Sequence, residues 1–88
     1  MAWLNAEEAS VVLSAYVLIE TEVGKVAHVA QALSGLDGVQ LAEDITGPYD
    51  IIARVQASGL DQLGRLVASH IQVVDGVTRT LTCMVIQR

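Results

Sequence analysis

One short turn, Thr46-Gly47-Pro48-Tyr49-Asp50, carries the side chains best suited to hold a small zwitterionic molecule. A glycine lets the backbone approach a ligand closely, and the Asp50 carboxylate can accept hydrogen bonds from an ammonium group. Adjacent Gly and Pro are also typical of a tight turn, so a plain hairpin in which Asp50 caps its own backbone explains the same residues. Both interpretations stay open, and the residue types alone favour the hairpin.

The other residues capable of chemistry are dispersed along the chain. His28 and His70 have no Cys or acidic partner at metal-ligand spacing, which indicates surface histidines. Cys83, the single cysteine, alternates with threonines and is predicted to be a core thiol. Thr80 and Thr82 could offer hydroxyls to a ligand, although threonine is also an ordinary strand residue. No phosphate loop, zinc-protease motif or nucleophile elbow is present, so we predict no catalytic residue, metal or cofactor.

Length and charge restrict the class of partner. The 88 residues allow one domain, and ten acidic against five basic residues give a formal net charge of −5. The basic residues are scattered, so the chain lacks the basic face that binds nucleic acid or an anionic membrane. One cysteine and an N-terminus without a basic region indicate a reducing compartment and no signal peptide, and we therefore expect a cytoplasmic protein.

Hydrophobic patterning predicts the elements that position these residues. Apolar runs predict strands over 11–20, 39–46, 50–57 and 77–86, and helical spacing predicts helices over 24–34 and 58–73. We expect Ser58 to cap the second helix. The apolar stripe of that helix is predicted to be Leu60, Leu63, Val67 and Ile71. The order βαββαβ predicts an α+β, ferredoxin-like fold with a four-stranded antiparallel sheet and both helices on one face.

The two halves of the chain also repeat. Asp37-Gly38-Val39 and Asp75-Gly76-Val77 lie 38 positions apart, and at the same offset Val17 matches Val55. A fold with both helices on one side leaves the other sheet face bare, and hydrophobic residues make up 52% of this small chain. We therefore predict an oligomer that dimerises through this open face. Candidate residues for the open face are Tyr16, Leu18, Ile52, Arg54, Thr80, Thr82 and Met84.

Several segments together resemble a known family, the ligand-binding (RAM) domain of the leucine-responsive/asparagine-type (Lrp/AsnC) transcriptional regulators. The segments are Ala15-Tyr16-Val17-Leu18-Ile19, Gly38-Val39, Thr46-Gly47-Pro48-Tyr49-Asp50-Ile51-Ile52 and Asp75-Gly76-Val77-Thr78-Arg79-Thr80-Leu81-Thr82. The resemblance covers residues 12–88 and makes residues 1–11 a short N-terminal extension. Full-length members carry an N-terminal helix-turn-helix, for which this extension is too short, so the resemblance implies a stand-alone module.

The resemblance implies partners and a site. Domains of this family are ferredoxin-like, dimerise sheet to sheet, often form octamers, and bind amino acids between dimers near the Gly-x-Tyr-Asp turn. The expected partners are thus an amino acid or related metabolite, further copies of the chain, and full-length regulators of the family. No nucleic acid or membrane partner is expected. The implied ligand-binding residues are Gly47, Tyr49, Asp50, Thr80 and Thr82, followed by Ser69 and His70.

Two other functions stay open at this point. Small dimeric α+β barrels of this kind include monooxygenases and isomerases, which need a titratable cluster between sheet and helices, whereas the helix stripes here are aliphatic. The other alternative is a purely structural assembly module, in which the turn at Gly47 would be closed and packed.

Overall fold

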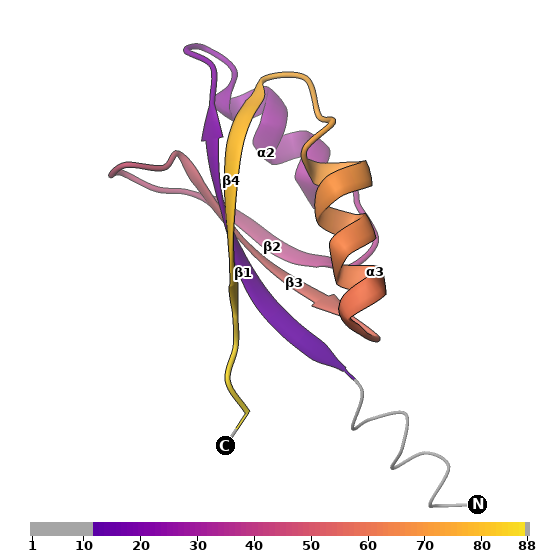
Figure 1. Ribbon diagram of the computed structural model, residues 1–88. Coiled ribbons are helices and arrows are strands. Elements are labelled where there is room, and N and C mark those ends of the chain that lie inside the picture. The colour runs from indigo at the N-terminus through magenta and orange to yellow at the C-terminus, as the bar shows by residue number, and fades with distance from the viewer. Residues whose placement is uncertain (1–11, 88) are drawn as a thin grey trace, which may run out of the picture.

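The computed structural model describes residues 12–87, which form one antiparallel sheet with helices on one face (Figure 1). The elements are β1 (Leu13–Thr21), α2 (Val26–Ser34), β2 (Val39–Asp44), β3 (Ile51–Ala57), α3 (Leu60–Arg65), the π-helix η1 (Leu66–Ile71) that continues α3, and β4 (Val77–Met84). The four strands are ordered β2-β3-β1-β4. The predicted ferredoxin-like α+β fold is confirmed, while the predicted extension over 1–11 lies outside the described residues.

Alternating burial, complete on β3 and nearly so on β1, shows which sheet face meets the helices. Ala15, Val17 and Ile19 of β1 are fully buried, as are Ile51 and Val55 of β3. They pack against helix residues that are equally or nearly as buried: Val29, Leu33, Leu63, Leu66 and Ile71. Removing these aliphatic side chains from water is the main favourable contribution to folding, at about 25 cal/mol per Å² of apolar surface.

The edge strand β4 has the opposite phase to the one predicted. Residues directly opposite each other in an antiparallel pair point to the same face. Thr82 lies opposite the buried Val17, and Leu81 lies opposite Leu18 on the open face. The open-face prediction was therefore wrong for Thr80, Thr82 and Met84, which lie on the helix side.

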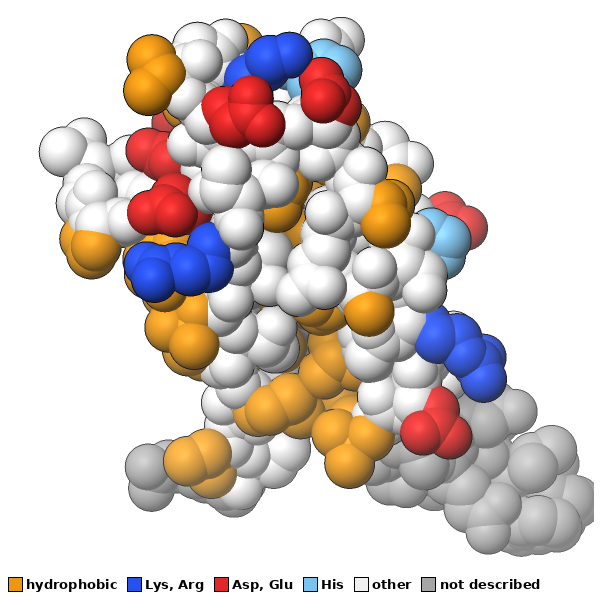
Figure 2. All heavy atoms as spheres, turned by 45° about the horizontal axis from the view of Figure 1, so that its top comes forward, with side chains coloured by type: hydrophobic (Ala, Val, Ile, Leu, Met, Phe, Trp, Pro, Cys, Tyr) orange, Lys and Arg blue, Asp and Glu red, His pale blue; other side chains and the backbone are white. Residues whose placement is uncertain are grey.

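The position of β4 at the sheet edge explains this error. The strand packs along β1 but makes little contact with α3, and Figure 2 shows apolar side chains left uncovered between strand and helix. Polar threonines are therefore tolerated on the helix side of β4, where a covered strand would require apolar residues. Cys83, on the open face opposite Tyr16, is exposed, so the prediction of a core thiol was wrong.

The open face contains the predicted residues of the central strands. Tyr16 lies opposite Arg54, and Leu18 lies opposite Ile52. Nη1 of Arg54 donates a hydrogen bond of 2.7 Å to the Tyr16 hydroxyl. Apolar side chains remain exposed on this face, as shown by exposed fractions of 37% for Tyr16 and 46% for Leu81.

The second helix differs from the prediction in its start and its stripe. Its N-cap is Gly59, without a side-chain hydrogen bond, so the predicted Ser58 cap was wrong. Leu60 is 70% exposed and Leu66 is buried instead. The amide of Gln72 bonds to the carbonyl of Val67, five residues earlier, because the π-helix widens the last turns and shifts the buried stripe. No helix in the described part of the chain is long and apolar enough to cross a membrane.

Candidate functional site

The turn between β2 and β3 is pinned to the end of β1 by Asp50. Its Oδ2 accepts a hydrogen bond of 2.8 Å from the Thr21 backbone N–H and one of 3.4 Å from the Thr21 hydroxyl. The Asp50 amide donates in turn to the carbonyl of Ile19, at 2.9 Å. Asp50 thus caps a neighbouring strand rather than its own backbone, and it fixes the turn in position.

Gly47 gives the turn an open surface. Its φ of +150° is a conformation that residues with a side chain rarely adopt, and no atom lies within 4 Å of where a Cβ would be. Gly47 and Pro48 are both exposed. A ligand or a neighbouring subunit can therefore reach the backbone at this point.

Tyr49 lies against an arginine that the motif search did not single out. The guanidinium carbon of Arg79 is 5.2 Å from the centroid of the Tyr49 ring, within the range of a cation–π interaction. Arg79 Nε lies 3.9 Å from Glu20 Oε1, the residue opposite it in the sheet. The turn therefore joins β1 and β4 through one cluster of an aromatic ring, a cation and a carboxylate.

Thr80 belongs to a shallow pocket next to this cluster. Its hydroxyl accepts a hydrogen bond of 2.9 Å from the side-chain amide of Gln72. Both residues, with Thr78 and Arg79, line a pocket of about 350 Å³. Thr82 lies two residues further along β4 and is exposed. Sequence reasoning missed Arg79 and Gln72, although Arg79 stands inside one of the segments that carry the family resemblance.

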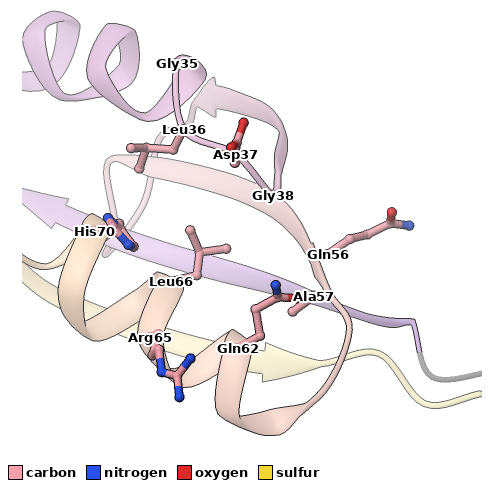
Figure 3. A pocket seen from close by; sticks show the side chains of 10 residues that line it. All are labelled: Gly35, Leu36, Asp37, Gly38, Gln56, Ala57, Gln62, Arg65, Leu66 and His70. Carbon is pink, nitrogen blue, oxygen red and sulfur yellow. The ribbon is translucent and has the colours of Figure 1, made fainter. Parts of the chain in front are cut away.

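The residues expected at the end of the second helix are not all brought to the turn. Ser69 is exposed and lines neither described cavity. His70 lines a second cavity of about 690 Å³, formed by the loop after α2, the end of β3 and the second helix (Figure 3). Within one subunit, the structure thus gathers Gly47, Tyr49 and Asp50 at the turn, places Thr80 in the adjacent pocket, and assigns His70 to a different cavity.

The titratable groups with a perturbed pKa lie outside both cavities. Lys25 Nζ and Asp75 Oδ2 form an exposed ion pair of 3.0 Å. The hydrogen bond and the charge of Lys25 lower the pKa of Asp75 below its usual value, and Asp75 raises the pKa of Lys25 in the same way. Within residues 12–87, no three His, Cys, Asp or Glu side chains gather closely enough to hold a metal ion.

The fold is that of a small α+β domain with an exposed turn that a small molecule could reach, and comparison with known proteins assigns it to the ligand-binding domains of transcriptional regulators. Residues 14–88 match the family model of the Lrp/AsnC ligand binding domain. The chain therefore belongs to the Lrp/AsnC family of transcriptional regulators.

Individual relatives agree with this assignment. An uncharacterised helix-turn-helix-type transcriptional regulator of Pyrococcus abyssi is 30% identical over 81 residues, covering 92% of this chain and 51% of that protein. A solved protein of Thermus thermophilus superimposes with a TM-score of 0.82 at 30% identity, covering 86% of this chain and 95% of that one. Escherichia coli AsnC gives 0.81 at 26% identity, covering 86% and 52%. The chain thus spans about half the length of the full regulators.

Two further matches are more limited. A transcriptional regulator of Neisseria meningitidis, solved as an L-Met complex, has a TM-score of 0.78 at 13% identity, covers 99% of this chain and 56% of that one, and shows the fold alone. A homocitrate synthase of Saccharolobus islandicus is 37% identical over 60 residues, 68% of this chain but 13% of the enzyme. That match concerns a small part of the enzyme and carries no reaction over to this chain.

Proposed function

We propose that this domain binds an amino acid or a closely related metabolite at a boundary between subunits, beside the turn at Gly47. The observation that supports it most is the construction of the turn, which is rigidly held by Asp50 yet open at Gly47. A fixed, exposed backbone next to an aromatic ring costs little ordering energy when it binds a ligand. An open, one-sided surface of this kind also suits a site that a second subunit completes.

Assembly is the second part of the proposal. The open sheet face exposes Tyr16, Leu41 and Leu81 to the extent of 37%, 43% and 46% of their surface. Exposed apolar side chains on one sheet face, here with Arg54 between Leu41 and Tyr16, are typical of an interface between identical chains. We expect dimers to form sheet to sheet through this face and to associate further, up to an octamer, through the turns and the uncovered side of β4.

The proposed effector class is an amino acid, as one protein of the same fold suggests. The Neisseria meningitidis regulator with this fold was solved with L-Met, which supports an amino acid as the ligand here. The net charge of −5 disfavours direct contact of this domain with DNA, so we propose that it acts on transcription through association with DNA-binding regulators of the family. A ligand shared between subunits would shift the assembly equilibrium, which couples the effector to the regulator.

The alternatives are less well supported by the described residues. The middle of the layer between sheet and helices is filled by fully buried aliphatic side chains such as Val17, Leu33 and Ile71. Among the described residues no titratable side chain is buried there, whereas an enzyme of the barrel type would need a titratable cluster in that layer. A purely structural module would have a closed turn, whereas no atom packs where a Cβ of Gly47 would be.

Calorimetric titration of the assembled protein with each of the twenty amino acids tests the proposal. We expect at least one to bind, and Tyr49→Ala to weaken that binding roughly tenfold or more, because it removes an aromatic wall of the site. Leu60→Ala, which truncates an exposed side chain far from the turn, is the control and should bind like wild type. Absence of binding to all twenty by an intact oligomer would contradict the amino-acid proposal.

A further inference from the structure

The cavity that contains His70 is larger than the pocket beside Thr80 and has no role in the proposed turn site. It lies at the end of β3 that is remote from the turn, since β3 begins after Asp50 and ends at Ala57, which lines the cavity. Seven residues of strand separate the two places, or roughly 20 Å. The volume of about 690 Å³ falls within the range of small-molecule sites.

The lining combines an apolar floor with hydrogen-bond donors on one wall. Leu36, Ala57 and Leu66 supply the apolar surface, and Leu66 is buried beneath the cavity. The second helix contributes Arg65 and His70 to the wall. Figure 3 shows Arg65 and His70 on the same helix, with Leu66 between them and the Asp37–Gly38 loop. Such a lining suits an aliphatic molecule that carries one anionic group.

Arg65 is the positively charged side chain in this cavity that can bind an anionic group. Of the basic residues in the described part of the chain, Lys25 pairs with Asp75, Arg54 bonds to Tyr16 and Gln40, and Arg79 lies against Glu20 and Tyr49. Within the same residues Arg65 makes no hydrogen bond or ion pair, and it borders the larger of the two cavities described above, in an otherwise acidic chain. A guanidinium in that position can receive a carboxylate in bidentate geometry.

Two glycines on the cavity wall allow a ligand to approach the backbone closely. Gly35 and Gly38 form part of the opposite wall, and both are exposed. The π-helix on the other side is a feature that occurs frequently at functional sites. Its five-residue spacing buries Leu66 and Ile71 together and leaves His70 on the cavity wall.

We propose that this cavity is a second binding site, for a small aliphatic carboxylic acid. Arg65 and His70 receive the carboxylate, and the carbon frame lies on Leu36 and Leu66. The site lies within one subunit and is separate from the turn site at Gly47, so each can exist without the other.

Three probes with one carbon skeleton test the recognition chemistry. They are L-leucine, its 2-oxo acid 4-methyl-2-oxopentanoate, and the amine 3-methylbutylamine, which lacks the carboxylate. We expect both acids, and not the amine, to shift the ring resonances of His70 in the assembled protein labelled with ¹³C-histidine. His28, the other histidine of the chain, is exposed on α2 and serves as the internal reference. Similar affinities for the two acids would show that the shared carboxylate carries recognition, and a response to leucine alone would overturn the proposal.

A matched pair of variants tests the role of Arg65. Arg65→Gln should weaken binding of both acids roughly tenfold or more, whereas Lys25→Gln, which removes an exposed cation that lines neither cavity, should not. Tyr49→Ala should leave the His70 response intact, which separates this site from the turn site. Saturating shifts of His70 by the amine, an unchanged affinity of Arg65→Gln, or no His70 response to either acid would each overturn the proposal, whatever the outcome at the turn.

Discussion

Two turns of identical sequence pattern, Asp37-Gly38-Val39 and Asp75-Gly76-Val77, occupy equivalent places in the two halves of the fold. Each follows a helix and leads into an edge strand of the sheet. Both glycines adopt a positive φ, of +93° at Gly38 and +101° at Gly76. The local sequence therefore determines the same local backbone twice.

Each turn packs against the helix of the other half, but the two turns are packed to different extents. Gly76 is buried against the start of α2, where a Cβ would lie 2.8 Å from the Cβ of Lys25. Gly38 is exposed and meets the second helix at Leu66, six residues after the helix begins at Leu60, and a cavity lies beside it. Tertiary packing, rather than the turn motif, thus decides which turn is closed and which one borders a candidate binding site.

Of the substitutions at these two turns, Gly76→Ala should cause the largest loss of stability. The new Cβ would clash with the Cβ of Lys25, which cannot move without the α2 backbone, and it would sit at a strained φ. We expect a loss of about 3 kcal/mol in the free energy of unfolding, measured by urea denaturation. Gly64→Ala, in α3 with no atom near its Cβ, is the control and should be neutral or slightly stabilising. A Gly76→Ala protein as stable as wild type would mean that the Gly76 turn is not closed.

Gly38→Ala should cost less, although the backbone strain is similar. Its Cβ would lie 3.0 Å from the Gln56 carbonyl and 3.1 Å from a terminal methyl of Leu66. The Leu66 methyl can give way toward the cavity, so we expect a loss of about 1–2 kcal/mol, dominated by the strain at φ. Urea denaturation of both variants under one set of conditions checks the ranking. A larger loss for Gly38→Ala than for Gly76→Ala would reverse the assignment of closed and open turns.

The fold was predictable because its signals are local. Apolar runs, helical spacing and the two turn motifs predict six elements and their order, and the 38-residue match of Val17 with Val55 lies in the core, where both are fully buried. The phase of β4 was not predictable, because an edge strand without a covering helix can place threonines on either face. The π-helix was equally hidden, since no residue type in 66–71 signals a wider turn.

The site was only partly predictable for a related reason. The turn residues Gly47 to Asp50 are contiguous, so their types reveal a candidate site. Arg79 reaches Tyr49 from another strand, and Arg65 shares a cavity with Gly38 from a helix more than twenty residues later. Such clusters exist only after the elements have packed, and a search for spaced motifs does not find them.

The smallest loss of stability is expected on removal of the ion pair between Lys25 and Asp75, next to Gly76. Asp75→Asn removes the partner of Lys25, and because both side chains are exposed, the loss of stability should be slight and should shrink further at high salt. Asp37→Asn is the matched control at the open turn, since Asp37 makes no ion pair among residues 12–87. Its stability at neutral pH should equal that of the wild type.

The pH dependence separates the pair from a general effect of charge. Lys25 lowers the pKa of Asp75 below 3.8 in the folded state, so the contribution of Asp75 is present above that value and is lost as the pH falls through the lowered pKa. Asp75 raises the pKa of Lys25 above 10.5, so the contribution of Lys25 is present below that value and is lost as the pH rises through the raised pKa. Thermal unfolding should therefore show a small, constant gap between wild type and Asp75→Asn from about pH 5 to pH 9, which closes at both extremes. A gap of the same size and pH profile for Asp37→Asn would show that the two turns do not differ in their ion pairing.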